Sequence, residues 1–104
     1  MILERPELHI LPERFVVEVT ADDILHGQPC DAATCPLALA VTRWLRQRRI
    51  PFLTVSVGFP DVNIYLDNRT LPRRHYWHDA FRFVSDFDHG AVVKPRTVVL
   101  AKLP

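Results

Sequence analysis

The sequence is poor in glycine and cysteine and has no long apolar run. It contains three glycines and two cysteines, and none of its apolar runs approaches the roughly 20 residues that a membrane-spanning helix needs. Its first residues, MILERPELHI, carry charges and a proline where a secretory signal has its apolar centre. We therefore expect a cytoplasmic protein with reduced cysteines. The formal net charge of +1 supplies no strong field that would attract nucleic acid or a membrane.

The motifs that mark common enzymes are also missing. The chain has no glycine-rich phosphate loop, no serine nucleophile elbow and no HExxH metal motif. Asp86 and Asp88 lie near His78 and His89 in the sequence, but acids at such spacing are usually solvated, and no converging set of catalytic groups can be named. We therefore expect no enzymatic activity and no cofactor.

The chain does contain enough apolar side chain for one hydrophobic core. Of its 104 residues, 48% are hydrophobic, which suits a single domain. Residues 1–13 contain two prolines and are expected to form an extended N-terminal arm. Residues 14–104 are expected to form one domain.

Hydrophobic periodicity predicts an α+β fold with a small, mainly antiparallel sheet of about four strands and two main helices on one face. Apolar alternation predicts strands at residues 15–20, 52–57, 62–66 and 97–103. Helical spacing predicts helices from Pro36 to the Arg48-Arg49 pair and from about Pro72 to His89. A short helical turn is expected between Thr20, as its cap, and Gly27, in a left-handed conformation, with Ile24 and Leu25 pointing inward.

Residues 20–40 carry a combination of motifs that resembles a family of small proteins from bacteriophages and actinobacteria-like genomes. Members pair a D-I-x-x-G turn with a C-P-[IVL]-A-L-A helix start, matched here by residues 23–27 and 35–40. They also carry an F-D-x-G element followed by V-x-P, matched by residues 87–90 and 93–95. The family is mostly uncharacterised, so the resemblance implies a phage-type accessory protein, in the host cytoplasm, without a defined activity. Residues 66–78 have no counterpart in this pattern.

His26, Cys30 and Cys35 are the candidates for a metal or thiol site. Cys35 precedes a helix-starting proline, where the helix dipole lowers a thiol pKa. The competing interpretation is a small buried side chain that fills a tight gap, and this is the one we favour. The spacing His-x3-Cys-x4-Cys lacks the close cysteine pairs of zinc fingers and needs a fourth ligand from elsewhere. A zinc- or thiol-dependent domain is therefore only the third functional alternative, and we expect no metal.

Two basic clusters are the predicted macromolecule-binding surfaces. The first lies on the polar face of the second predicted helix and comprises Arg43, Arg46 and Arg49. The second lies around residue 73 and comprises Arg69, Arg73, Arg74, Tyr76 and Trp77, with His75 between them. We expect them to bind a host or phage protein, which the chain inhibits or modulates. The alternative is a nucleic-acid-binding module using Arg43, Arg46, Arg73 and Arg74, because single-strand binders interleave basic and aromatic residues. A homodimer through a sheet edge is a further alternative.

Overall fold

The computed structural model of the chain describes residues 11–58, 61–67, 71–78 and 80–102. The elements in chain order are β1 (Arg14–Val19), α1 (Ala21–His26), α2 (Pro36–Gln47), β2 (Thr54–Val57), β3 (Asp61–Tyr65), β4 (Arg73–His78), α3 (Phe81–Asp88) and β5 (Arg96–Lys102). Most of the predicted arm, residues 1–10, lies outside this description. In the described part of the chain, no helix has both the length and the apolar character needed to cross a membrane.

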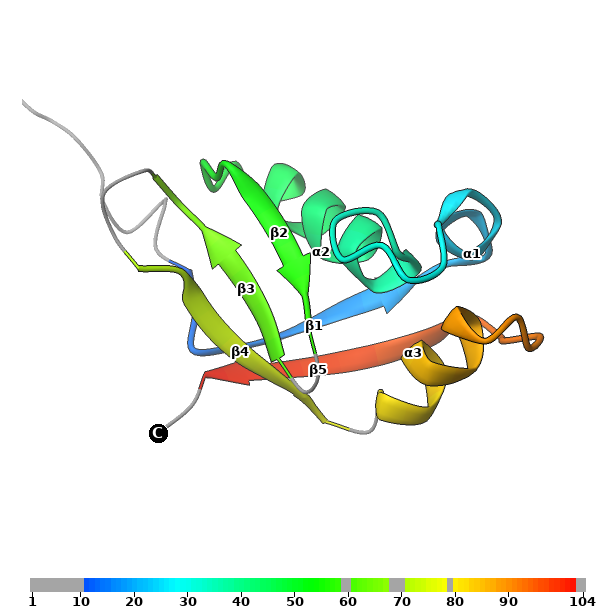
Figure 1. Ribbon diagram of the computed structural model, residues 1–104. Coiled ribbons are helices and arrows are strands. Elements are labelled where there is room, and N and C mark those ends of the chain that lie inside the picture. Colours follow the sequence, from blue (N-terminus) through cyan, green and yellow to red (C-terminus); the bar gives the residue numbers. More distant parts are fainter. Residues whose placement is uncertain (1–10, 59–60, 68–70, 79, 103–104) are drawn as a thin grey trace, which may run out of the picture.

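The five strands form one antiparallel sheet in the order β1-β5-β4-β3-β2. The sheet curls into a half-barrel, and α2 packs against β1 and β2, the two edge strands (Figure 1). α1 packs in turn against α2. The predicted α+β class is therefore confirmed, but the sheet has five strands where about four were expected.

The core follows the apolar patterns of the sequence. In β1 the buried Phe15, Val17 and Val19 alternate with exposed residues, as a strand with one covered face requires. The predicted helical stripe of α2 is also buried, with Leu37, Val41, Trp44 and Leu45 facing the sheet side of the core. These two patterns place α2 across the open side of the half-barrel.

The start expected for the last helix, at about Pro72, is wrong, because residues 73–78 form strand β4 between β3 and β5. The segment reads RRHYWH, and its aromatic residues favour a strand. Among the β4 residues whose burial is described, the buried one is the polar His75, which is 1% exposed, so apolar periodicity could not reveal the alternation. The helix itself, α3, begins only at Phe81. This strand accounts for the additional member of the sheet.

The predicted capped turn is confirmed, whereas the role expected of Gly27 is wrong. The Thr20 hydroxyl accepts the Asp23 N–H at 3.2 Å, and the Asp23 carboxylate accepts the Thr20 N–H at 2.9 Å, a reciprocal capping box. Gly27 has a φ of −71°, so it is not left-handed. A Cβ at Gly27 would instead lie 2.6 Å from the Cδ of Pro36, so glycine is required by close packing. Leu25, expected to point inward, is 76% exposed.

Contacts within the chain engage both edges of the sheet. At the β1 edge, the Glu18 carbonyl accepts a hydrogen bond from Arg43 Nη2 at 2.7 Å. At the β2 edge, the Val57 N–H donates to the Ala32 carbonyl at 2.8 Å. These contacts occupy backbone groups that an added strand would need, so they weaken the homodimer alternative.

Candidate functional site

The first predicted basic cluster is divided by the structure, because Arg43 is engaged within the protein. Its Nη1 and Nη2 donate to the two carboxylate oxygens of Asp23 at 2.6 and 2.9 Å. The Asp23 side chain is 5% exposed and that of Arg43 is 37% exposed. Burial alone would raise the pKa of Asp23, but the hydrogen bonds from Arg43 and Thr20 hold that pKa below its usual value. Arg43 therefore joins α2 to α1 and β1 and is a poor candidate for binding a partner.

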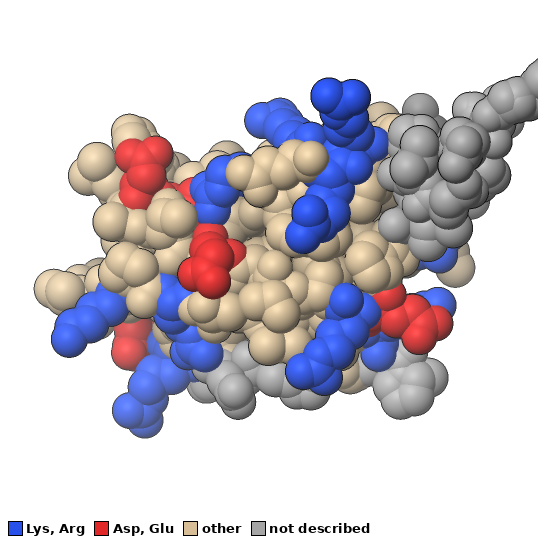
Figure 2. Space-filling view, turned by 180° about the vertical axis from the view of Figure 1, so that it is seen from behind, with Lys and Arg blue, Asp and Glu red and all other residues tan. Residues whose placement is uncertain are grey.

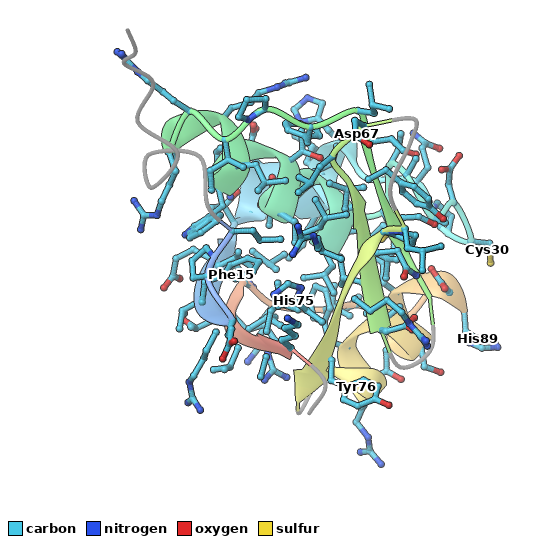
Figure 3. All side chains as sticks on the ribbon, turned by 90° about the vertical axis from the view of Figure 1, so that its left-hand side faces the viewer. Phe15, Cys30, Asp67, His75, Tyr76 and His89 are labelled. Carbon is cyan, nitrogen blue, oxygen red and sulfur yellow. The ribbon has the colours of Figure 1, made fainter. Side chains whose placement is uncertain are left out.

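The second predicted basic cluster is not one surface. Arg74 Nε and Nη2 donate to Asp61 Oδ2 at 3.0 and 2.7 Å, and this contact raises the pKa of Arg74. His75 points into the curl of the sheet toward Phe15, while Tyr76 points to the outer face (Figure 3). Because successive strand residues face opposite sides, the exposed Arg73 does not share a face with Arg74. Arg69 and the side chain of Trp77 lie outside the described residues.

The best candidate site is the arginine patch, which we define as Arg46, Arg48, Arg49 and Phe52 at the C-terminal end of α2. All three arginines are exposed. The Arg46 guanidinium carbon lies 5.9 Å from the centroid of the Phe52 ring, and that of Arg48 lies 4.7 Å from a ring centroid of Trp44. Such stacking limits the freedom of a guanidinium group while leaving its N–H donors available. In the rear view, basic side chains gather over the surface of α2 (Figure 2).

The surface of the arginine patch contains a shallow hollow. It has a volume of about 370 Å³ and is lined by Arg46, Arg49, Ile50, Pro51 and Phe52. Ile50 is buried, so the floor of the hollow is apolar while cationic side chains flank it. A carboxylate-bearing side chain with an apolar neighbour therefore matches the hollow in both charge and polarity.

Arg49 occupies a backbone position that glycine normally fills. α2 ends in a Schellman motif, in which the Ile50 N–H donates to the Leu45 carbonyl at 3.0 Å and the Arg49 N–H to that of Arg46 at 3.1 Å. Arg49 has a φ of 59°, a left-handed conformation that strains a residue with a Cβ by about 1–2 kcal/mol. α3 ends in the same motif, and there the corresponding residue is Gly90, with a φ of 83°. The chain thus uses arginine at one of two equivalent positions where glycine is unstrained.

The two cysteines lie in different environments. Burial raises the pKa of Cys35 and outweighs the N–H groups of Ala38 and Leu37, which argues against the alternative of a low-pKa thiol. Cys35 is 4% exposed and belongs to the core, as the favoured interpretation predicted. Cys30 is exposed, with its N–H donating to Asp88 Oδ1 at 2.9 Å (Figure 3). His26 Nδ1 lies 3.0 Å from the Asp22 carbonyl. No group of three or more His, Cys, Asp and Glu residues within the described ranges is arranged to hold a metal ion.

Sequence reasoning identified Arg46 and Arg49 but missed Arg48 and Phe52 as members of the patch. The available signal was the run of arginines that ends at Arg49, separated only by Ile50 from Pro51 and Phe52. Comparison of the chain with protein-family models, curated proteins and solved structures found no match. The interpretation of the patch therefore depends on its own geometry.

The buried His75 gives the protein a predictable response to acid. Its Nε2 lies 3.0 Å from the Pro12 carbonyl, and its Nδ1 has no partner among the described residues. Burial, with the charges of Lys102 and Arg73, lowers the pKa of His75 below its usual 6.5. The folded state therefore binds a proton less readily than the unfolded state, and stability falls as the pH drops below 6.5 toward the folded-state pKa.

Urea unfolding across this range provides the measurement. Between about pH 7.5 and 5.5 the wild-type free energy of unfolding should fall by up to about 1.4 kcal/mol per pH unit. The His75→Gln variant keeps a donor toward the Pro12 carbonyl but does not titrate, so its pH profile should be nearly flat here. Parallel profiles for the two proteins would show that another group controls acid stability.

Proposed function

We propose that this chain is a small, non-enzymatic, phage-type accessory protein whose arginine patch docks an acidic segment of a host or phage protein and modulates it. The observation that carries the proposal is the left-handed Arg49. A position that costs backbone strain is retained most readily where its side chain contributes to function. The arginine at this position contrasts with Gly90 at the end of α3.

The chemistry of the patch fits carboxylate groups. Guanidinium groups donate paired N–H groups in a planar fork, which matches the two oxygens of a carboxylate. Arg46 and Arg48 are each stacked on an aromatic ring, so less side-chain freedom is lost when a partner binds. An Asp- or Glu-containing segment with one apolar side chain would place its acids on the arginines and its apolar group in the hollow.

A protein partner is favoured over nucleic acid by the charges around the patch. Arg43, one helical turn before Arg46, is already paired with Asp23 and also lies in the field of Asp22. A nucleic-acid strand needs a continuous basic track for successive phosphates. These carboxylates interrupt such a track, whereas a short acidic segment needs only the patch. Nucleic-acid binding through the same arginines is the second candidate.

A paired binding experiment tests the proposal. The probes are a fluorescein-labelled peptide that alternates aspartate and leucine and a single-stranded oligonucleotide of equal charge, each titrated by fluorescence anisotropy at several salt concentrations. The Arg46→Ala/Arg49→Ala variant should bind the peptide at least about tenfold more weakly, because charge-assisted hydrogen bonds contribute about 1.5–3 kcal/mol each. Arg14→Ala/Lys102→Ala removes two exposed cations elsewhere and serves as the matched control.

The oligonucleotide distinguishes the two candidate functions. If it binds more tightly than the peptide, with steep salt dependence that the patch variant removes, the nucleic-acid alternative replaces the proposal. Equal losses for the patch variant and for Arg14→Ala/Lys102→Ala would show that the peptide follows general charge and that the patch is no specific site.

A further inference from the structure

A second surface lies at the other end of the molecule from the arginine patch, between α3 and the start of β5 (Figure 1). It is a groove of about 480 Å³, which we call the C-terminal groove. The groove is lined by Arg82, Phe83, Asp86, Val93, Lys94 and Arg96, among others. It includes all three residues of the V-x-P element noted in the sequence, none of which belongs to the arginine patch.

The chain beside this groove belongs to no regular element. The α3 helix ends in its Schellman motif, with the Ala91 N–H donating to the Asp86 carbonyl at 2.9 Å. The chain then runs outside any regular element until β5 begins at Arg96. Pro95 has no N–H to donate, so a sheet ladder cannot continue through it toward Val92. The segment 92–94 is thus kept beside the sheet and outside it.

The backbone of this segment has unused hydrogen-bonding capacity. Residues 92–94 make no backbone hydrogen bond to any other residue in the described ranges. Val93 is half-buried and packs against the core, while Lys94 is exposed and Val92 is 96% exposed. A segment with one side chain anchored inward and its backbone unpaired can exchange main-chain hydrogen bonds with an added strand.

The charges around the groove favour acidic side chains on such a strand. Arg82, Lys94 and Arg96 are cationic, and Asp86 is the one carboxylate among the lining residues. Phe83 and Val93 provide apolar surface between these charges. An extended peptide presents alternate side chains to one face, so acids alternating with apolar residues would meet both features.

We propose that the C-terminal groove binds an extended acidic peptide segment, which adds to residues 92–94 as a β-strand with its carboxylates toward Arg82 and Lys94. The site is separate from the arginine patch, so each can fail without the other. Main-chain hydrogen bonds supply affinity in this mode, and the charged groups supply selectivity. The exposed Val92 packs against an apolar side chain of the added strand.

Two peptides with identical side chains distinguish binding by strand addition from binding by charge attraction alone. The first is a short peptide that alternates glutamate and valine, and the second is the same peptide with alternate backbone nitrogens methylated. Binding is followed by two-dimensional NMR of the labelled protein. The first peptide should shift the amide signals of residues 92–94, and the methylated peptide should bind about tenfold more weakly, the loss of roughly two hydrogen bonds.

Variants then locate the site. Arg82→Glu/Lys94→Glu should lower affinity for the unmethylated peptide, while Arg46→Ala/Arg49→Ala should leave the shifts at residues 92–94 unchanged. Arg14→Glu/Lys102→Glu reverses the same number of exposed charges elsewhere and controls for net charge. Equal affinity for both peptides would overturn strand addition. Shifts confined to the arginine patch would overturn the groove as a site, even if the proposed function of the patch holds.

Discussion

Replacing Arg49 with glycine is expected to make the protein more stable and its binding weaker. Glycine adopts the left-handed conformation at Arg49 without strain, which offsets its larger entropy loss on folding and leaves a net gain of about 0.5–1 kcal/mol. Loss of the guanidinium group should weaken binding of the aspartate-leucine peptide about tenfold. Chemical unfolding and anisotropy titrations of the same preparation measure both effects.

The equivalent position in α3 supplies the control. Gly90 has a φ of 83°, and an added Cβ there would meet no atom within 4 Å. Gly90→Ala should therefore lower stability by about 1 kcal/mol through backbone strain alone. If Arg49→Gly instead lowers stability, the Arg49 side chain supports the fold. If stability rises and binding is unchanged, Arg49 is not retained for this partner chemistry.

Removing Arg43 is expected to produce the largest loss of stability among the arginine variants. Arg43→Ala leaves the buried Asp23 carboxylate without its cationic partner and the Glu18 carbonyl without its donor. Breaking a buried ion pair typically costs about 3–5 kcal/mol, and we expect about 2–3 kcal/mol because Arg43 retains 37% exposure of its side chain. Urea unfolding near neutral pH measures the change.

Arg46→Ala is the matched comparison on the same helix. Arg46 is exposed and its described contact is the ring of Phe52, so stability should change by no more than about 0.5 kcal/mol. The two substitutions should therefore have different effects: Arg43→Ala should lower stability, and Arg46→Ala should weaken binding. Similar stability losses for both would show that the ion pair with Asp23 contributes little.

Local patterns were sufficient to predict the parts of the fold that bury apolar side chains. In α2, the apolar residues from Leu37 to Leu45 recur at helical spacing, and in β1 apolar residues alternate with polar ones. In both elements the buried face can therefore be identified from the sequence. β4 could not be found in this way, because the polar His75 is buried where alternation predicts an apolar residue, and its neighbours are charged or aromatic. Only the pairing with β3 and β5 reveals it as a strand.

The candidate site was only partly predictable for a related reason. Arg43 and Asp23 lie 20 residues apart, and no local pattern links them, so the ion pair that engages Arg43 could not be predicted. The left-handed backbone at Arg49 depends on how α2 ends before Pro51, and an arginine gives no local sign of such a conformation. The C-terminal groove could not be predicted because it depends on backbone groups without hydrogen-bond partners. The residue types in the sequence do not show which backbone groups lack a partner.

The most direct test of the proposed function places a photoreactive phenylalanine analogue at Phe52, inside the arginine patch, in the cells where the chain acts. Irradiation followed by peptide mapping should identify one protein, crosslinked through a segment rich in aspartate or glutamate, and Arg46→Ala/Arg49→Ala should remove that product. The same analogue at Leu25, which is 76% exposed on α1, serves as the control. Crosslinks to nucleic acid alone, or the same products from both positions, would contradict a docking role for the patch.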